Sequence, residues 1–266
     1  MHKVAALLRA SALNAASYRL SLVLSAVGLL ATIVPIYFVA NALQPVMAPR
    51  IQSEAANYFG FVLVGIFLFA FIRPATRQFP NIISGGIATG TLEAMLSTST
   101  RVPTIFAGLA SYGFTLQLVR GVLMLGFGAI LGAQLLWGAA LSSVLIVLLT
   151  IVPYMAIGVL SATMVLVFRT PGPLGNIVMV LSGLLGGVYY PTHVIPGWLE
   201  GVSAFIPLTY GLRALRRMLL NAEPFQAVLP DVAILALFAA GLMGASAILF
   251  RLAFQHARRA GTLTHY

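Results

Sequence analysis

Few side chains in this chain carry the chemistry of an active site or a metal centre. The sequence has 5 Asp and Glu residues and 4 histidines among 266 residues, and it has no cysteine. The carboxylates form no pair close in sequence and the histidines show no ligand spacing, so acid–base catalysis and metal binding have no support. A phosphate-binding Walker loop needs a lysine in a glycine-rich turn, and the only lysine is Lys3. We therefore predict no catalytic, cofactor or metal site in this chain, and no hydrolysis of ATP by it.

Arginine supplies nearly all of the remaining charge. Lys and Arg number 15 against 5 acids, which gives a formal net charge of +10. These residues are scattered between apolar stretches rather than gathered in a patch, so they do not predict nucleic-acid binding. Arg120 lies inside an apolar stretch, where a charge is costly and usually faces the bundle interior or a water-filled cavity. It is a candidate for lining a transport pathway; the alternative is that it snorkels to the headgroups or pairs internally.

Three more arginines, Arg213, Arg216 and Arg217, are spaced three and four residues apart in a segment rich in proline. This spacing places them on one side of a helix that would follow Pro207. Three roles are open: the arginines could hold an outer gate shut, attract anionic lipid headgroups, or stabilise the fold by capping helix ends. In the structural alternative, their partners would be two nearby carboxylates, Glu200 and Glu223.

The composition identifies the elements that position these residues. Hydrophobic residues make up 60% of the chain and charged residues 8%, whereas soluble domains carry about 25% charged residues. The apolar runs are too long and continuous for the alternating strands of a barrel, so they predict an all-α membrane protein. We predict a single domain, 1–266, with six spans at about 20–40, 55–72, 106–131, 141–168, 174–190 and 231–254.

The segments between the spans carry predictions of their own. Residues 3–19 show helical spacing of apolar positions, which predicts an N-terminal amphipathic helix at the membrane interface. Residues 76–103 form a polar loop. Residues 191–217 are broken by prolines, which interrupt a helix, and non-helical backbone survives at membrane depth only where protein or water covers it. We therefore predict an outer re-entrant helical hairpin between spans five and six.

The distribution of positive charge predicts the orientation. With a cytoplasmic N-terminus, ten of the Lys and Arg residues lie inside, four lie outside and Arg120 lies in the membrane. Both termini are therefore expected in the cytoplasm, with the chain in a bacterial-type plasma or inner membrane.

Four motifs in this order resemble the permease subunit of a type 2 ATP-binding-cassette (ABC) exporter, and the resemblance covers the whole chain. The GTLE sequence at 90–93, followed by Met95 and Leu96, resembles the family motif between spans two and three. Residues 187–199 resemble the stretch that ends span five, and 207–216 resemble the PLTY…LR signature. The tail 259–266 resembles an ending found in one branch. One departure is that Ile83–Thr89 is uncharged, where relatives place charged residues.

The resemblance implies partners and site residues. Such exporters pair two permease copies, identical or closely related, with two cytoplasmic ABC ATPase subunits, and ATP and Mg bind to those ATPases. A short helix at the GTLE motif would sit in a groove of the ATPase; the alternative is a generic helix start without partner contact. The ATPase-coupling candidates are Gly90, Thr91, Leu92, Glu93, Met95 and Leu96. The outer-gate candidates are Tyr190, Pro191, Pro196, Trp198, Pro207, Thr209, Tyr210, Arg213 and Arg216.

The expected function is ATP-driven export of an amphipathic, drug-like or lipid-like substrate, because the spans contain few polar residues to line a hydrophilic tunnel. A lipid-linked glycan is the alternative cargo. An ATPase-independent carrier or a membrane scaffold is a second alternative. Ion coupling generally needs carboxylates within the membrane, and only Asp231 lies at the edge of a predicted span. Besides the ATPase and the second permease copy, the expected partners are membrane lipids.

Overall fold

The computed structural model describes residues 19–90, 102–136, 138, 140–168 and 172–259. Within these ranges the chain forms helices joined by turns and loops, with no β-strand, as predicted. Most of residues 3–19 lie outside these ranges, so the N-terminal interfacial helix stays a prediction. The helices are α2 (Arg19–Ile51), α3 (Tyr58–Phe69), α4 (Ile72–Ala88), α6 (Val102–Ile130), α7 (Ala140–Phe168), α8 (Leu174–Leu185), α9 (Gly197–Ser203), α10 (Pro207–Leu219) and α11 (Leu229–Arg259).

Five helical stretches in the described part are long and apolar enough to cross a membrane. They are Val27–Ile51, Tyr58–Gly86, Gly113–Ile130, Leu141–Val165 and Phe225–Gln255. The fifth predicted span, 174–190, is not among them, because α8 ends at Leu185 and is shorter than expected. Gly187 adopts a φ of +82° just beyond the helix, in the left-handed region that favours glycine. A 3₁₀ turn at Thr192–Val194 and the short helix α9 follow.

The second span is longer than its predicted range of 55–72. Helices α3 and α4 follow each other with only Ala70 and Phe71 between them, and α4 continues to Ala88. The short break has a local cause, because Pro74 has no N–H to donate to the carbonyl of Ala70. The predicted polar loop, 76–103, is therefore helical over its first part.

Helix α2 is also longer than the predicted first span, 20–40. It continues through Pro45 and Pro49 to Ile51, since a helix can accommodate a proline by bending. In the same part of α2, the side-chain oxygen of Gln44 accepts a hydrogen bond of 2.6 Å from the backbone N–H of Tyr58. This bond joins the C-terminal part of α2 to the start of α3.

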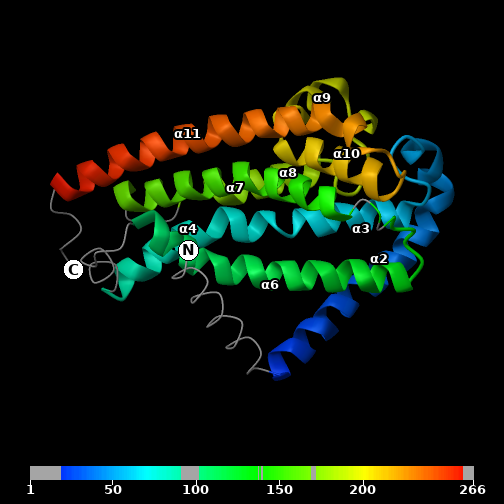
Figure 1. Cartoon of the computed structure of the whole chain (residues 1–266), viewed down its shortest axis with the longest axis horizontal. Helices are drawn as coiled ribbons and strands as arrows, with labels where there is room; N and C mark the ends of the chain where they lie inside the picture. Colours follow the sequence, from blue (N-terminus) through cyan, green and yellow to red (C-terminus); the bar gives the residue numbers. More distant parts are fainter. Residues whose placement is uncertain (1–18, 91–101, 137, 139, 169–171, 260–266) are drawn as a thin grey trace.

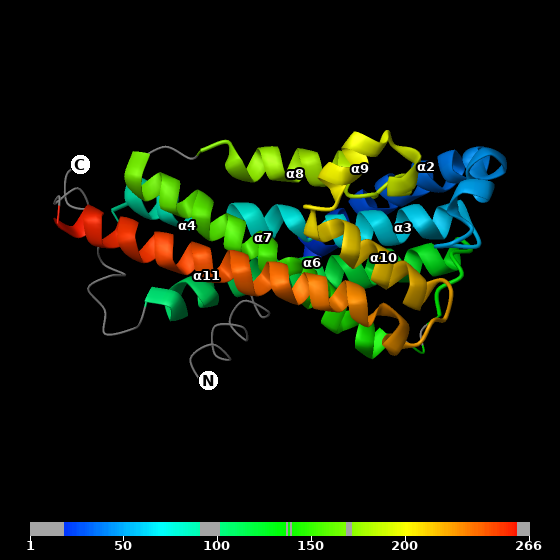
Figure 2. The same cartoon turned by 90° about the horizontal axis from the view of Figure 1, so that it is seen from above.

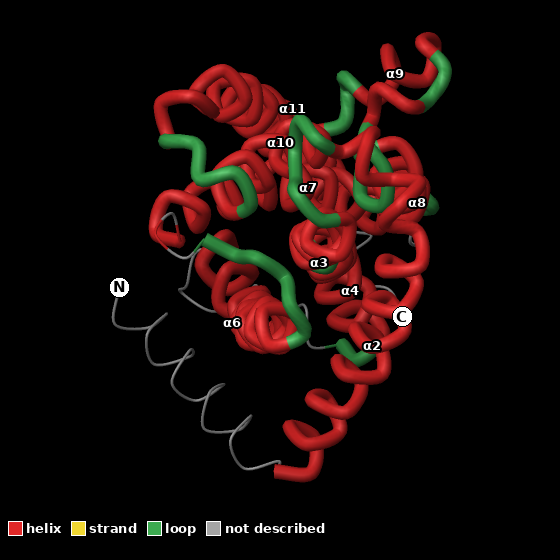
Figure 3. Tube along the Cα trace, turned by 90° about the vertical axis from the view of Figure 1, so that its right-hand side faces the viewer, coloured by secondary structure: helices red, strands yellow, loops and turns green. Residues whose placement is uncertain are grey.

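The two ends of the bundle are easily told apart (Figure 1). Ala88, Phe168 and Arg259 close α4, α7 and α11 at one end, here named the Ala88 end. Ile51, Tyr58 and Leu219 lie at the other, here named the Leu219 end. Figure 3, which looks along the bundle, shows α3 near its middle, with α2, α6, α7, α8 and α10 around it.

Burial follows this arrangement. In the most apolar part of Tyr58–Gly86, 72% of the residues are buried inside the protein, against 11% for Val27–Ile51 and 17% for Phe225–Gln255. Helix α2 leaves the bundle toward its N-terminal end (Figures 1 and 3). Large apolar side chains such as Phe38 on α2 and Leu237 on α11 are exposed. Such surfaces suit contact with lipid.

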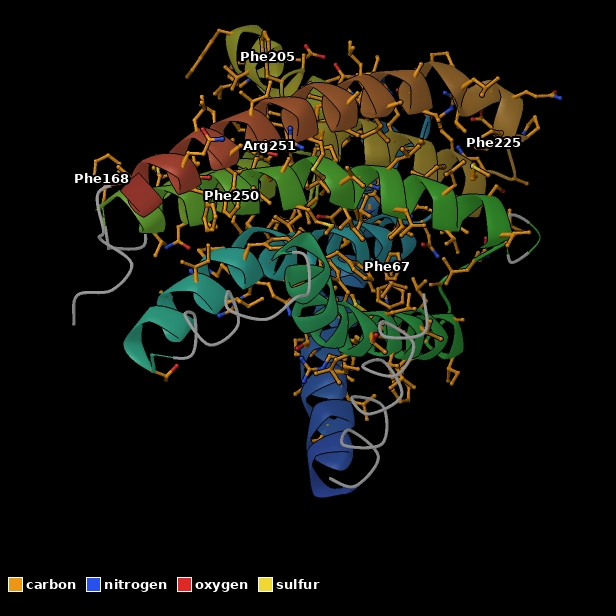
Figure 4. All side chains as sticks on the ribbon, turned by 60° about the vertical axis from the view of Figure 1, so that its left-hand side comes forward. Phe67, Phe168, Phe205, Phe225, Phe250 and Arg251 are labelled. Carbon is orange, nitrogen blue, oxygen red and sulfur yellow. The ribbon has the colours of Figure 1, made fainter. Side chains whose placement is uncertain are left out.

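Small residues allow the outer helices to approach the central one closely. A Cβ atom at Gly158 of α7 would lie 2.3 Å from the backbone oxygen of Ala75. A Cβ at Gly121 of α6 would lie 2.7 Å from the ring of Phe67, which fills the space between α3 and α6 (Figure 4). Gly128 of α6 and Gly183 of α8 leave room for Leu63 and Phe69 in the same way, since their Cβ positions would lie 2.1 and 3.0 Å from these side chains.

These contacts predict the effect of adding a single methyl group. In Gly158→Ala the new Cβ must push backbone away, an overpacking cost of about 1–3 kcal/mol, which the better helix propensity of alanine offsets by at most about 1 kcal/mol. We expect a lower midpoint of thermal unfolding for the purified chain. Gly241→Ala in α11 is the matched control, because nothing lies within 4 Å of that Cβ position. Equal midpoints for the two variants would contradict the packing described.

Candidate functional site

Helix α10 places the arginines that the sequence singled out. Pro207 opens the helix at a position where a missing N–H costs nothing. Its apolar residues recur at helical spacing and pack into the core, so the helix presents one face to the bundle. The residues of this buried face, each no more than 5% exposed, are Leu208, Leu212, Leu215 and Leu219.

Arg216 projects from α10 into the protein and is 1% exposed. Its Nη1 donates a hydrogen bond of 3.0 Å to Glu54. Its Nη2 donates to the backbone oxygens of Phe61, Gly187 and Val188 at 3.1, 2.8 and 3.1 Å. The guanidinium carbon also lies 3.3 Å from the centre of the Phe61 ring. One side chain therefore connects α10 to the turn after α2, to α3 and to the turn after α8.

The carbonyl partners of Arg216 have a local origin. The last carbonyl groups of a helix have no partner within the helix, and the backbone that follows α8 turns back on itself at Gly187. Gly65 of α3 leaves room for this backbone, because a Cβ there would lie 2.2 Å from the oxygen of Val188 and 3.0 Å from Nη2 of Arg216. A glycine on a neighbouring helix is thus part of the Arg216 site.

The other two arginines of α10 form a second set of ion pairs. Arg213 donates to Asp231, with Nε at 2.9 Å from Oδ1, and its guanidinium lies 5.2 Å from the centre of the Tyr210 ring. Nε and Nη2 of Arg217 donate to Glu223 at 2.9 and 2.6 Å, and Nη1 lies 3.8 Å from Asp231. The hydrogen bond to Glu223 raises the pKa of Arg217, so this guanidinium stays charged. Asp231 is 2% exposed and lies in the first turn of α11, where the helix dipole favours a negative charge.

The structure agrees with one of the two ion-pair partners suggested from the sequence. Arg217 pairs with Glu223, whereas Glu200 lies in the first turn of α9 and is exposed. Sequence reasoning missed Glu54 and Asp231 as partners. Two features of the sequence could have identified them. Carboxylates are rare in this chain, and Glu54 and Asp231 each lie next to a long apolar stretch.

The remaining outer-gate candidates separate into a buried and an exposed group. Pro191, Pro207 and Thr209 are buried, and Thr209 donates a hydrogen bond of 3.0 Å to the backbone oxygen of Ser203. Tyr210 is partly buried and donates to the oxygen of Ala204 at 2.9 Å, while Tyr190 donates to the oxygen of Leu184. Pro196 and Trp198 are exposed, Trp198 by 73%. Phe205, just beyond α9, also projects away from the bundle (Figure 4).

The other candidates lie away from α10. Arg120 is partly buried in α6, next to Gly121, which packs against Phe67 and Phe71. Gly90 is exposed at the Ala88 end and adopts a φ of +67°. Thr91, Leu92, Glu93, Met95 and Leu96 lie outside the described residues, so their role in coupling stays a prediction.

The two kinds of arginine in α10 predict different sensitivities. Arg216→Met would leave Glu54 and two turn carbonyls without their donor, and breaking a buried pair costs about 3–5 kcal/mol. In Arg213→Met the Asp231 carboxylate keeps Arg217 nearby, and the lost side chain is 46% exposed, so the expected cost is about 1 kcal/mol or less. The yield of monodisperse protein and the unfolding midpoint in detergent measure both. Equal losses for the two variants would contradict the assignment of Arg216 as the buried anchor.

Comparison with known proteins gives two matches. The family model described as "ABC-2 type transporter" matches residues 2–220. Linearmycin resistance permease protein LnrN of Bacillus subtilis (strain 168) is 24% identical over 155 residues, which cover 57% of this chain and 39% of the relative. The family match spans most of the chain and includes both the predicted coupling motif and α10. The chain belongs to the ABC-2 type transporter family.

Proposed function

We propose that this chain is the membrane permease subunit of an ATP-driven exporter, powered by a separate cytoplasmic ABC ATPase. The family match over residues 2–220 carries this proposal, because the family's permeases work with ATPases and this chain has no Walker lysine. The five apolar helices are consistent with a multi-pass membrane protein. The permease copies would form a homodimer or a close heterodimer.

The Ala88 end is the proposed cytoplasmic end. Helix α4 ends at Ala88 at this end, where α7 and α11 also finish (Figure 1). The GTLE motif follows α4 directly in the sequence. Arg258 and Arg259, the last two residues of α11, lie at the same end, which supports the orientation by the positive-inside rule. A movement of the ATPase would act on the GTLE segment and reach the pathway through α4 and α6.

The Leu219 end would then hold the outer gate. Helices α8, α9 and α10 follow one another along the chain. Helix α10 begins deeper in the bundle and runs to the Leu219 end (Figure 1). This arrangement supports the re-entrant hairpin. In this proposal Arg216 fixes α10 to the central helix, while the exposed α9 and Trp198 contact lipid or the second copy. The cargo would leave beside α10, as an amphipathic drug-like or lipid-like molecule.

The coupling proposal predicts the behaviour of the GTLE segment. Replacing Leu92 and Leu96 with serine would remove the apolar contacts to the ATPase, so stimulation of ATP hydrolysis should fall to the level of the ATPase alone. The measurement is ATP turnover of the co-purified complex in vesicles. Gln226→Ala, at an exposed position of the opposite end, should leave the stimulation unchanged. A chain that neither binds nor stimulates any ABC ATPase would rule out the proposed function.

The orientation can be tested without altering native thiols, because the chain has no cysteine. Thr89→Cys at the Ala88 end should react with a membrane-impermeant maleimide only in inverted vesicles. Gln226→Cys, at the Leu219 end, should react only in intact cells. Both positions are exposed. The reverse pattern would place the GTLE segment on the external face, where no cytoplasmic ATPase can reach it.

A further inference from the structure

Helix α4 carries a polar stripe inside a stretch otherwise long and apolar enough to span a membrane. Arg73, Arg77, Asn81 and Ser84 follow one another at helical spacing and are all exposed or partly exposed. The other faces of α4 are occupied, since Ala75 meets Gly158 of α7, Thr76 meets Gly175 of α8, and Gln78 meets Gly113 of α6. The four residues form what we name the α4 stripe, which lies between α6 and α8.

The two arginines of the α4 stripe lie inside the apolar region of the bundle. Ala75 is level with Gly158, and the apolar stretch of α7 continues for about seven more residues, to Val165, toward the Ala88 end. At roughly 1.5 Å per residue, this places Ala75 about 10 Å inside that boundary. Arg73 and Arg77 lie two residues on either side of Ala75. Both are therefore deeper than predicted, since the sequence placed Arg73 just beyond the span 55–72 and Arg77 in the polar loop 76–103.

Helix α8 covers the α4 stripe only in part. Its first turn is level with Thr76, so α8 begins well short of the Ala88 end (Figure 2). At this point Arg77 donates a hydrogen bond to the side-chain oxygen of Asn176. Beyond it, toward Ala88, Asn81 and Gly85 are exposed. An arginine at membrane depth usually faces a water-filled cavity or the bundle interior, and the side chain of Arg73 is exposed among the described residues.

No described carboxylate balances the charge of the α4 stripe. Among the described carboxylates, Glu54, Glu223 and Asp231 pair with the arginines of α10. Glu200 lies on α9, and Glu93, the fifth acid, falls outside those ranges. The N-terminus of α8 is the positive end of the helix dipole, so it adds to the positive electrostatic potential around the α4 stripe. Beside it the Oγ of Ser161, in a residue 3% exposed, has no hydrogen-bond partner and lies 3.6 Å from the Cβ position of Gly175.

We propose that the α4 stripe and the start of α8 bind the acidic group of an amphipathic cargo, with Arg73 and Arg77 as the residues that select for negative charge. This inference rests on the proposed function and narrows its substrate class to molecules that join an apolar body to a carboxylate or phosphate. Guanidinium groups bind such oxyanions with charge-assisted hydrogen bonds. The apolar body would lie along the exposed side chains of α8, among them Ile177, Val180 and Leu184.

The depth of Arg73 favours cargo over a resident phospholipid as the source of the acidic group. The phosphate of a bilayer lipid stays in the headgroup layer, outside a hydrocarbon core about 30 Å thick. Arg73 lies deeper than Ala75, which is itself about 10 Å inside the apolar boundary. A molecule on its way through the protein can place its acidic group at that depth, with the donors of the α4 stripe replacing its hydration.

The test uses the full chain in phosphatidylcholine nanodiscs, without ATP or ATPase, and a matched pair of photoactivatable probes. One probe is a 16-carbon alkyl carboxylate and the other is the corresponding alcohol. The wild-type chain should reach half-maximal labelling at an about tenfold lower concentration of the carboxylate. The double variant Arg73→Gln with Arg77→Gln should label equally with the carboxylate and the alcohol. The double variant Arg73→Lys with Arg77→Lys keeps the positive charge and should keep most of the preference for the carboxylate. Arg251→Gln, an exposed arginine on α11 (Figure 4), is the matched control and should keep it fully.

Each outcome decides the proposal. Equal labelling of the wild-type chain by both probes would overturn the proposal. This comparison needs no variant, so the proposal stays testable even if the double variant does not fold. An unchanged preference in a folded double variant would also overturn it. If phosphatidylglycerol, at the same mole fraction as the carboxylate probe, prevents labelling by that probe, the site binds a bilayer lipid. That result would overturn the assignment to cargo. Because no ATPase is present, failure here leaves the coupling test of the proposed function unaffected.

Discussion

Arg216 carries a positive charge into a place that water does not reach, and the Leu219 end of the bundle is arranged around its hydrogen bonds. A buried charge is tolerated only when it is paired and hydrogen-bonded, and here the partners come from three separate segments: Glu54 after α2, Phe61 in α3, and the turn at Gly187 and Val188. This requirement fixes where α10 lies. It also explains why Gly65 must be small, and why the backbone can turn sharply after α8 without leaving its carbonyls unpaired.

The two groups of arginines in the described part stand in opposite electrostatic situations. Those of α10 are balanced, since three carboxylates meet three guanidinium groups at the Leu219 end. Those of α4 have no described carboxylate partner and lie on a stripe whose residues are exposed or partly exposed. In the proposed permease the first group holds a structure together, and the second offers a site for negative charge. Paired charges at one end and an exposed positive stripe nearer the other would suit the proposed uptake of cargo from the cytoplasmic side.

Much of this architecture could be predicted from residue patterns. The helical membrane class and the ABC-2 transporter family are confirmed by the helices and by the family match. The breaks near Gly187, Pro196 and Pro207 follow from glycine and proline chemistry. Two features could not be predicted locally. Glu54 and Arg216 are 162 residues apart, and only the folded chain brings them together. Arg73 and Pro74 resembled the end of a span, because charge and proline usually mark one, whereas packing against α7 carries the helix on to Ala88.

A double-mutant cycle between Glu54 and Arg216 tests the central interaction most directly. The variants are Glu54→Gln, Arg216→Gln and their combination, and the measurement is the thermal unfolding midpoint of each purified chain. If the two side chains act as one buried unit, the double variant should lose little more stability than the more damaging single variant, a strongly non-additive result. Additive losses would mean that Glu54 and Arg216 act independently, and that α10 is held in place by other contacts.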